Sequence, residues 1–407
     1  EDGLSYDETC ELARQRGREI FGAIFREFPE IDLFFFFLTA GTPDNFLYAT
    51  ASDPVGTMRG NRDLWPSFVN GIIDAFPEEA TFVDGNEHGY HGESDLNDFY
   101  VKHFNQRQGL LGLVAPENRR KYQAMLSVGF GQYLDCYIYK PSDSKTWYKG
   151  PAEDGSRLTH FERNLEQAAR CSSQYVWIYG EHRLWIDWKK YPGSEIWKTK
   201  RYVDMMALPE PTWEKSLPGL TDAILSVKNP MSFARKKLTE YRASGESHEL
   251  CREGNCRIAG CADGTINAGR IPWGFSVYRK PGDTAGCCGI DTSVGRGDRA
   301  SLAMKGVAYC NVNFIQPAKE GECYVVSVST QSEKGQAEVC WMKGETWAWA
   351  ESEHFEFGEP DAEGWRTARL VVRVPRGVSK IGLLAQTSKL AADETVRFDD
   401  FSMIRLR

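Results

Sequence analysis

Four short hydrophobic segments in the first half of the chain constrain its fold most strongly. They span residues 31–38, 80–87, 124–133 and 175–181, and a segment with helical spacing of apolar residues precedes each one. The first, residues 31–38, is apolar at almost every position, which is typical of a strand buried on both faces of a parallel sheet. This alternation of helix and strand predicts a parallel α/β fold.

The predicted helices surround these strands in the sequence. No strand leads into a Gly-x-Gly-x-x-Gly loop, so a dinucleotide-binding fold lacks its phosphate loop. Long, aromatic-rich loops after the strands favour a (β/α) barrel instead. The helices are expected at residues 6–28, 64–76, 95–103, 116–122, 159–171, 213–227 and 231–241.

The number of βα units indicates an incomplete barrel. About four units are present, whereas a full barrel has eight, and the sequence opens on a helix. We interpret residues 1–242 as a partial (β/α) barrel and expect its N-terminal half to be a missing partner.

A different pattern follows residues 243–255, which we interpret as a linker. From residue 256 to residue 407 the chain carries short alternating strands separated by turns. Such a pattern predicts an all-β domain, a β-sandwich or jelly roll. Its strands are expected near residues 274–278, 323–329, 337–341, 365–373, 380–384 and 395–399.

Charge and composition exclude several classes of partner. The net charge is -8 and no basic run occurs, which argues against nucleic-acid binding. No segment reaches the roughly 18 apolar residues of a membrane span. Aromatic residues make up 13% of the chain, with 12 Trp and 17 Tyr, and many stand beside acids and amides. That mixture suits carbohydrate recognition, and it also suits an ordinary core.

The cysteines leave two interpretations open. There are 11, and eight of them lie between Cys251 and Cys340. Their spacing lacks the paired Cys-x-x-Cys of a zinc site. Disulfides of an exported domain and buried free thiols both fit this pattern.

Acids at two strand ends are the catalytic candidates. Alternation along residues 175–181 places Trp177, Tyr179 and Glu181 on one face, and barrels keep their chemistry at the carboxyl ends of their strands. Glycosidases use two carboxyl groups roughly 5–9.5 Å apart. We therefore predict Glu181 and Glu87 as the catalytic carboxyls, with Asp84 as a third candidate.

Each acid also has a structural interpretation. Glu87 fits a loop acid that hydrogen-bonds a neighbouring loop. Glu181 fits an ion pair with His182 or Arg183. Asp84 fits a structural hydrogen bond.

Predicted substrate contacts follow the strand ends, because sugar rings stack on aromatic side chains and sugar hydroxyls bind polar groups. Packing is the alternative for each aromatic residue. His88 and His91 lack the i, i+4 spacing of a helical zinc pair, so no metal is expected. The predicted contacts are Tyr90, His88, Tyr133, Asp135, Tyr179, His182, Trp185 and Trp188, with Trp147 and Trp197 as loop alternatives. In the second half, Trp341, Trp347 and Trp349 divide between the core and a binding platform.

Two resemblances extend this interpretation. Asn86-Glu87 is similar to the Asn-Glu that ends a barrel strand in retaining glycoside hydrolases, although there the strand is the fourth and here it counts as the sixth. Residues 256–407 resemble galactose-binding-like carbohydrate-binding modules. The segments that carry this second resemblance are Trp-Gly-Phe at 273–275, Gly-Glu-Cys-Tyr-Val-Val-Ser-Val at 321–328, Val-Pro-Arg-Gly at 374–377 and Arg-Phe-Asp-Asp-Phe-Ser-Met-Ile-Arg at 397–405.

Together the resemblances imply a glycoside hydrolase acting on a polysaccharide or oligosaccharide, with an appended carbohydrate-binding module. A secreted, periplasmic or cell-surface location is then expected. No cofactor is expected beyond a structural calcium of the β-sandwich, which many members of the second family bind through acids near the terminal strands. Asp399 or Asp400 is the candidate for such an acid here, and an exposed acid pair at a strand end is the other interpretation. The alternative function is a non-catalytic carbohydrate-binding or scaffold protein with a degenerate barrel. A barrel esterase lacks its Gly-x-Ser-x-Gly elbow.

Overall fold

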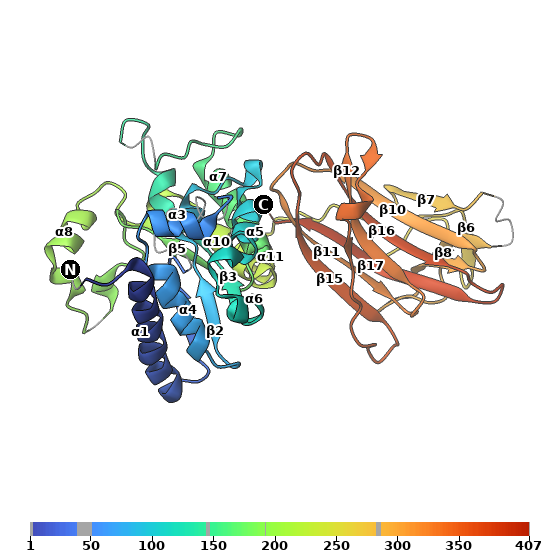
Figure 1. Ribbon diagram of the computed structural model, residues 1–407. Helices are drawn as coiled ribbons and strands as arrows, with labels where there is room; N and C mark the ends of the chain where they lie inside the picture. Colours follow the sequence, from blue (N-terminus) through green and yellow to red (C-terminus); the bar gives the residue numbers. More distant parts are fainter. Residues whose placement is uncertain (1–2, 39–50, 144–146, 192, 282–285, 407) are drawn as a thin grey trace. The chain divides into compact units, whose positions relative to one another are not determined.

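The computed structural model describes residues 3–38, 51–143, 147–191, 193–281 and 286–406 (Figure 1). Contacts within the chain divide it into two compact units, residues 1–227 and residues 228–407. The first unit mixes helices with parallel strands, and the second consists mainly of antiparallel strands.

The strands of the first unit are parallel and follow one another in chain order. β1, β2 and β3 form a three-stranded sheet in that order, and β4 pairs with β5. Only Gly129 separates β3 from β4. The strands fall inside the four predicted segments and are shorter than predicted. Their bounds are β1 Asp32–Phe35, β2 Thr81–Asp84, β3 Leu126–Val128, β4 Phe130–Tyr133 and β5 Val176–Tyr179.

Most helices of the first unit lie close to their predicted positions, but α3 and α8 were not predicted, and the helix expected at residues 213–227 is divided into α9 and α10. The longest, α1, begins with a capping box, in which Ser5 and Glu8 each bond the other's backbone N–H. The helices are α1 Tyr6–Glu27, α3 Pro54–Gly60, α4 Trp65–Ala75, α5 Asp98–Arg107, α6 Arg119–Met125, α7 Arg157–Cys171, α8 Lys200–Met206, α9 Trp213–Ser216 and α10 Leu220–Lys228.

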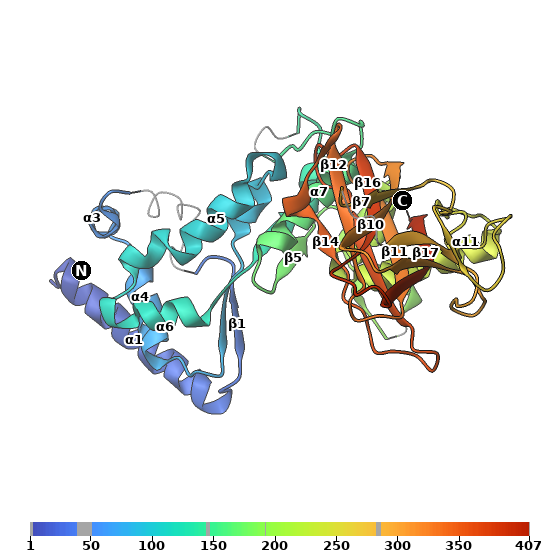
Figure 2. The ribbon, with the colours of Figure 1, turned by 90° about the vertical axis from the view of Figure 1, so that its right-hand side faces the viewer.

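Two glycines set the distance between α1 and α4, which lie side by side (Figure 2). A methyl group added at Gly17 would overlap the carbonyl oxygen of Phe68, and one added at Gly71 would overlap that of Arg14. The backbones of the two helices therefore touch where neither residue has a side chain. On this base, Ile72 of α4 and Phe82 of β2 are fully buried in one hydrophobic cluster.

The second unit is a β-sandwich that follows α11 (Pro230–Ser244). Its two six-stranded antiparallel sheets have the orders β13-β12-β16-β10-β7, with β14 on β12, and β15-β11-β17-β9-β8-β6. Val312 and Phe314 of β10 share one buried core with Val326 of β11, so the two sheets pack face to face. The strands are β6 Ile266–Ala268, β7 Phe275–Arg279, β8 Cys287–Asp291, β9 Ser301–Lys305, β10 Tyr309–Pro317, β11 Cys323–Thr330, β12 Gln336–Lys343, β13 Thr346–Trp347, β14 Glu353–His354, β15 Arg366–Arg373, β16 Lys380–Ser388 and β17 Thr395–Arg405.

The segment that we expected to be a linker, residues 243–255, packs on the sandwich. The N–H of Leu250 donates to the carbonyl of Met403 at 2.9 Å, and the N–H of Phe401 donates to the carbonyl of Gly254 at 2.9 Å. The Tyr241 hydroxyl of α11 donates to the carbonyl of Leu406 at 2.6 Å. The contacts thus place the boundary after residue 227, whereas the sequence pattern placed it after residue 242.

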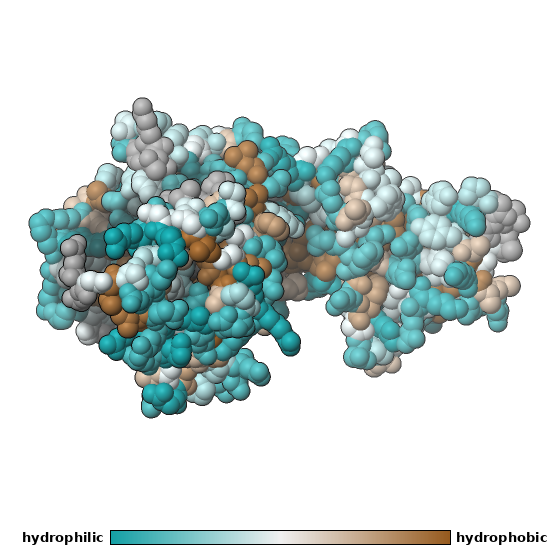
Figure 3. Space-filling view, in the orientation of Figure 1, coloured by the Kyte–Doolittle hydropathy of each residue, from teal (hydrophilic) through white to brown (hydrophobic). Residues whose placement is uncertain are grey.

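The surface, the lengths of the helices and the cysteines add three observations. The face of the molecule in Figure 3 is largely hydrophilic, with hydrophobic residues in small groups. In the described part of the chain, every helix is too short or too polar to cross a membrane. All 11 cysteines lie in the described ranges as free thiols.

Candidate functional site

Three tyrosines meet where β2, β4 and β5 end. The ring centroids of Tyr90 and Tyr133 are 5.2 Å apart, and those of Tyr133 and Tyr179 are 5.6 Å apart. The rings of Tyr90 and Tyr179 are within 8° of parallel. Tyr90 and Tyr133 are buried, whereas Tyr179 is 41% exposed. This tyrosine stack therefore leads from the core to solvent.

The two predicted catalytic glutamates lie beside the tyrosine stack. Burial, followed by the charges of Glu87 and Glu181, raises the pKa of the Tyr90 phenol. A hydrogen bond to Glu181 raises the pKa of Tyr179, and burial raises the pKa of Glu87 itself. Glu87 shares η1 with Tyr90, and Glu181 follows Tyr179 by two residues, so each glutamate stands in a segment that carries a ring of the stack.

The position of Glu87 depends on a turn that the strand pattern did not predict. β2 ends at Asp84, three residues earlier than expected, and Asn86 adopts a left-handed conformation with φ 39°. Glu87 then begins the 3₁₀ helix η1, Glu87–His91. Strand alternation therefore does not decide where Glu87 points.

Asp84 stabilises this turn. Its side chain is fully buried, and its Oδ1 accepts the backbone N–H of Asn86 at 2.9 Å. Burial raises the pKa of the Asp84 carboxyl to about 7. This geometry matches the structural interpretation of Asp84, because a fully buried carboxyl cannot reach a ligand.

Asp135 holds the loop that carries Glu181. Its carboxylate is completely buried and accepts the backbone N–H groups of Glu181 at 2.8 Å and of His182 at 3.1 Å. Its Oδ1 also lies 2.7 Å from Nδ1 of His182. The prediction had placed Asp135 against substrate, but its burial makes it a positioning residue.

The structural interpretation of Glu181, an ion pair with His182 or Arg183, does not fit the loop after β5 as described. His182 pairs with Asp135 instead, and Nε of Arg183 donates to the hydroxyl of Ser216 at 2.7 Å. The hydroxyl of Tyr139 lies 3.3 Å from that of Tyr133 and 3.5 Å from Nδ1 of His182. Sequence reasoning missed Tyr139, which no strand pattern marks.

Aromatic residues extend the tyrosine stack on one side. The rings of His91 and Trp147 stack at 4.6 Å, and Trp147 lies 5.7 Å from Tyr133. His88 joins this group through His91, at 6.1 Å. Within the described ranges, no three His, Cys, Asp or Glu side chains gather as metal ligands would.

The two predicted tryptophans of the loop after β5 contact rings other than those of the tyrosine stack. Trp185 is 6.1 Å from the ring of Trp213, and Trp188 is 6.0 Å from that of Tyr191. Neither ring contact reaches the tyrosine stack.

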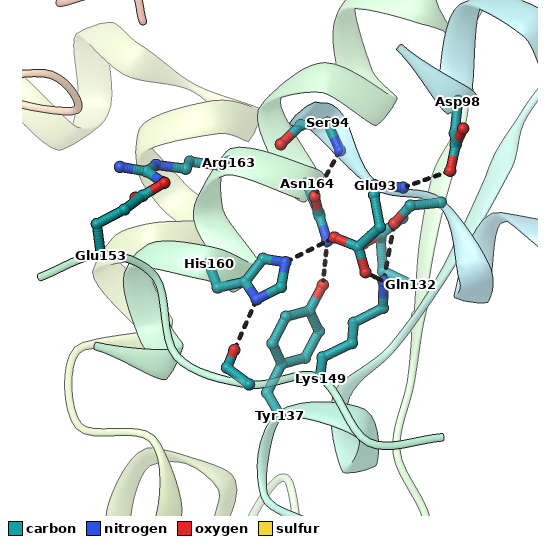
Figure 4. A network of polar contacts seen from close by, with 12 residues as sticks. Glu93, Ser94, Asp98, Gln132, Tyr137, Lys149, Glu153, His160, Arg163 and Asn164 are labelled. Atoms are coloured by element: carbon teal, nitrogen blue, oxygen red, sulfur yellow. Dashed lines mark hydrogen bonds and ion pairs between the residues drawn. The ribbon is translucent and has the colours of Figure 1, made fainter. Parts of the chain in front are cut away.

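A buried polar network fixes the segment that follows η1 (Figure 4). Lys149 forms an ion pair with Glu93 and donates to the carbonyl of Gly92 at 2.8 Å. Nε2 of His160 lies 2.7 Å from Oε2 of Glu93, and Asn164 accepts the N–H of Ser94 at 2.9 Å. The residues of this network are far apart in sequence, so no sequence motif predicts it. The network anchors the segment carrying Glu87 and Tyr90 to α7.

The pKa of Glu93 reflects these partners. Burial alone would raise it, but the hydrogen bond with His160 and the charge of Lys149 outweigh burial and hold it at about 2. Burial also opposes the charged form of His160, yet its bonds to Glu93 and to the Gly150 carbonyl raise its pKa.

The outer face of one sandwich sheet carries a second group of aromatic and amide side chains. The rings of Tyr278 and Tyr309 are 6.1 Å apart, and the Tyr309 hydroxyl donates to Oε1 of Gln386 at 2.8 Å. Trp341 belongs to the core. Trp347 and Trp349 stack with centroids 4.8 Å apart, and Trp349 is 52% exposed.

The acids expected near a calcium have protein partners. Asp399 is buried and accepts the backbone N–H groups of Arg296 at 2.7 Å and Asp400 at 2.8 Å. The carboxylate of Asp400 lies 2.8 Å from the Arg296 guanidinium.

Comparisons with known proteins give only distant similarities. No protein-family model matches the sequence, and no curated protein matches it. The Stig cyclase Fisc of Fischerella sp. TAU is 12% identical, with a TM-score of 0.30 over 39% of this chain and 97% of that one. The C-terminal family 22 carbohydrate-binding module of Clostridium thermocellum Xyn10B is 11% identical, with a TM-score of 0.25 over 36% and 98%.

A glycoside hydrolase is also among the similar structures. The α-L-arabinofuranosidase MgGH51 is 12% identical, with a TM-score of 0.28 over 39% of this chain. The matched region spans only 26% of that enzyme. At these TM-scores the similarities identify no function for the chain.

Proposed function

We propose that the first unit hydrolyses glycosidic bonds of a polysaccharide or oligosaccharide, with Glu87 and Glu181 as its carboxyl pair. The observation that carries the proposal is the position of the two glutamates in the segments that form the tyrosine stack: Glu87 lies in η1 with Tyr90, and Glu181 lies two residues after Tyr179. The exposed ring of Tyr179 offers a flat apolar surface to a sugar, and His182, three residues further along the chain, offers a half-exposed hydrogen-bonding group.

The two carboxyls have different roles in this proposal. Burial raises the pKa of Glu87, which keeps its proton available for the oxygen of the leaving sugar. Glu181 then acts as the carboxylate that attacks the sugar or activates a water molecule. Asp135 positions Glu181 through its backbone N–H.

The parallel strands support a larger barrel as the setting of this site. They follow in chain order, and helices connect β1 to β2, β2 to β3 and β4 to β5, as in consecutive βα units. β1 and β5 are end strands of their sheets, and the nearby side chains of Phe34 and Phe36 are exposed. We propose that further βα units pair with these edges.

For the second unit we propose carbohydrate binding on the sheet face that carries Tyr278, Tyr309 and Gln386. Aromatic rings next to amides suit sugar faces and hydroxyls. A protein that acts on polysaccharide in this way is expected to be secreted, periplasmic or at the cell surface.

The proposal is tested by release of reducing ends from a panel of polysaccharides. We expect Glu181→Gln to lower the rate at least 100-fold, because it removes the charge without changing the size of the side chain. Glu195→Gln is the matched control, since Glu195 is exposed and its ion-pair partner in the described part of the chain is the neighbouring Lys198.

Two outcomes would contradict hydrolysis. One is an unchanged rate in Glu181→Gln. The other is a wild-type protein that binds a glycan of the panel and cleaves none, which would indicate the non-catalytic carbohydrate-binding alternative.

A further inference from the structure

A polar groove lies on the outer face of the other sandwich sheet, where β15, β11 and β17 run side by side (Figure 1). Its volume is about 450 Å³. The groove lies on the opposite sheet from Tyr278 and Tyr309, so it is separate from the face proposed above.

The strand register builds the floor of this groove. Ser327 of β11 pairs with Arg369 of β15 on one side and with Ser402 of β17 on the other. Two residues along, Ser329 pairs with Thr367, and their hydroxyls are 2.8 Å apart. The side chains of Val326 and Val328, which alternate with these serines along β11, face the core, so the hydroxyls face the other side of the sheet.

Positive charge is concentrated in this groove. Arg252, Arg296 and Arg369 line it, against a single acid, Asp400, in a chain whose net charge is -8. Arg296 is already neutralised, because its guanidinium lies 2.8 Å from Asp400 and 3.2 Å from Asp361.

The other two arginines retain their binding capacity. Across the described ranges, no side chain forms an ion pair or hydrogen bond with the guanidinium of Arg252 or of Arg369. A planar guanidinium donates two parallel hydrogen bonds to a carboxylate or sulfate group. The hydroxyls of Ser327 and Thr367 supply further donors beside Arg369.

We propose that this groove binds the oxyanion, carboxylate or sulfate, of an acidic saccharide. The saccharide part rests on the proposed function of the second unit, and the oxyanion part rests on the groove itself. A neutral sugar would leave both arginines without a counter-ion and is expected to bind there weakly. The second unit would thus bind acidic glycans on one sheet, while its aromatic face belongs to the other sheet.

Calorimetric titration of the full chain tests this assignment. Three probes are compared: trigalacturonate, the neutral galactotriose and inorganic sulfate. We expect trigalacturonate to bind most tightly and to lose at least tenfold in affinity in Arg369→Gln, because a charge-assisted bidentate contact is removed.

The control is Arg366→Gln, which removes the same charge from the same strand. Arg366 pairs with Glu333 and does not line the groove, so trigalacturonate affinity is expected to stay within twofold. Arg252→Gln provides a second variant outside the strands, should Arg369→Gln lower the melting temperature.

Equal affinity of wild type and both groove variants for trigalacturonate would overturn the proposal. Binding of sulfate alone would overturn the acidic saccharide as the ligand. Since these readouts measure binding in the second unit, failure of hydrolysis by Glu87 and Glu181 would leave them unchanged.

Discussion

Asp135 illustrates how a single buried carboxylate organises the candidate site. It accepts three hydrogen bonds from the loop after β5 and is shielded from solvent. The sequence places it after a strand, as it does Glu181, and nothing in the pattern distinguishes a supporting acid from a catalytic one. Burial makes that distinction, and burial depends on contacts between strands remote in sequence.

Replacing Asp135 with Asn is expected to lower the free energy of unfolding by about 2–4 kcal/mol. The amide group would turn a donor toward N–H groups that need an acceptor. Urea denaturation measures the loss. Asp204→Asn is the control, because Asp204 is exposed and only pairs with Lys200 one turn away. Equal losses in the two variants would contradict the role of Asp135.

Glu93 makes the stability of the first unit depend on pH, and the direction of that dependence follows from its pKa. Its pKa is about 2 in the folded state and 4.5 ordinarily, so its stabilisation is complete above pH 4.5 and is lost as the pH falls toward 2. The raised pKa of His160 has the opposite sign: its contribution is complete below pH 6.5 and is lost as the pH rises through the raised value.

Both contributions are therefore present between pH 4.5 and 6.5. In that window Glu93→Gln is expected to cost about 1–3 kcal/mol of unfolding free energy, reduced from the full shift because Glu93 is partly exposed. At pH 2.5 the cost should shrink. Denaturation curves of both proteins across this range provide the measurement, and a cost independent of pH would contradict the network.

The sequence pattern correctly grouped the residues at the strand ends, but it wrongly grouped two loop tryptophans with them. Tyr133 and Tyr179 end parallel strands, and Glu87, Tyr90 and Glu181 follow such strands; the carboxyl ends of parallel strands meet at one edge, so their proximity follows from topology. Trp185 and Trp188 also follow a strand. A long loop carries them to other partners, and loop conformation leaves no periodic signal.

At the scale of elements, the strands and helices of the first unit were largely predictable, because the hydrophobic period changes clearly between them. Their ends were less so: β2 stops at Asp84 because Gly85 and Asn86 form a turn. The close approach of α1 and α4 was not predictable, since glycines in helices also occur without such contacts.

Gly17→Ala is expected to destabilise the first unit by about 2 kcal/mol or more, because the two helix backbones must separate. Gly22→Ala on the same helix is the control. Its new methyl group would lie 3.7 Å from that of Ala75, an ordinary contact, so helix propensity should stabilise it slightly. Thermal unfolding of both variants provides the measurement. If Gly17→Ala raised the stability as much as Gly22→Ala, the close approach of the two helices would be contradicted.

At the scale of the whole molecule, the chain consists of two units, and the boundary matters for any fragment. Alternating strands revealed the sandwich, but α11 and residues 246–254 look like a helix and a loop in sequence. Their attachment to β17 is a tertiary contact that periodicity does not encode.

A fragment of residues 228–407 is therefore expected to melt about 10 °C higher than one of residues 256–407. The shorter fragment lacks several backbone hydrogen bonds to β17, together worth about 3 kcal/mol. Calorimetry of the two fragments checks this, and coincident melting temperatures would show that residues 228–255 are a linker after all.

The central claim is that Glu87 and Glu181 act as one carboxyl pair. The most direct measurement is a double-mutant cycle on kcat/KM with Glu87→Gln, Glu181→Gln and the combined variant, on a polysaccharide that the wild type cleaves. When two groups act in the same chemical step, removing one already impairs that step, so removing the second as well lowers kcat/KM little further. The account predicts a combined variant no more than about tenfold slower than the slower single variant. Losses that multiply, or a single variant with the wild-type rate, would contradict it.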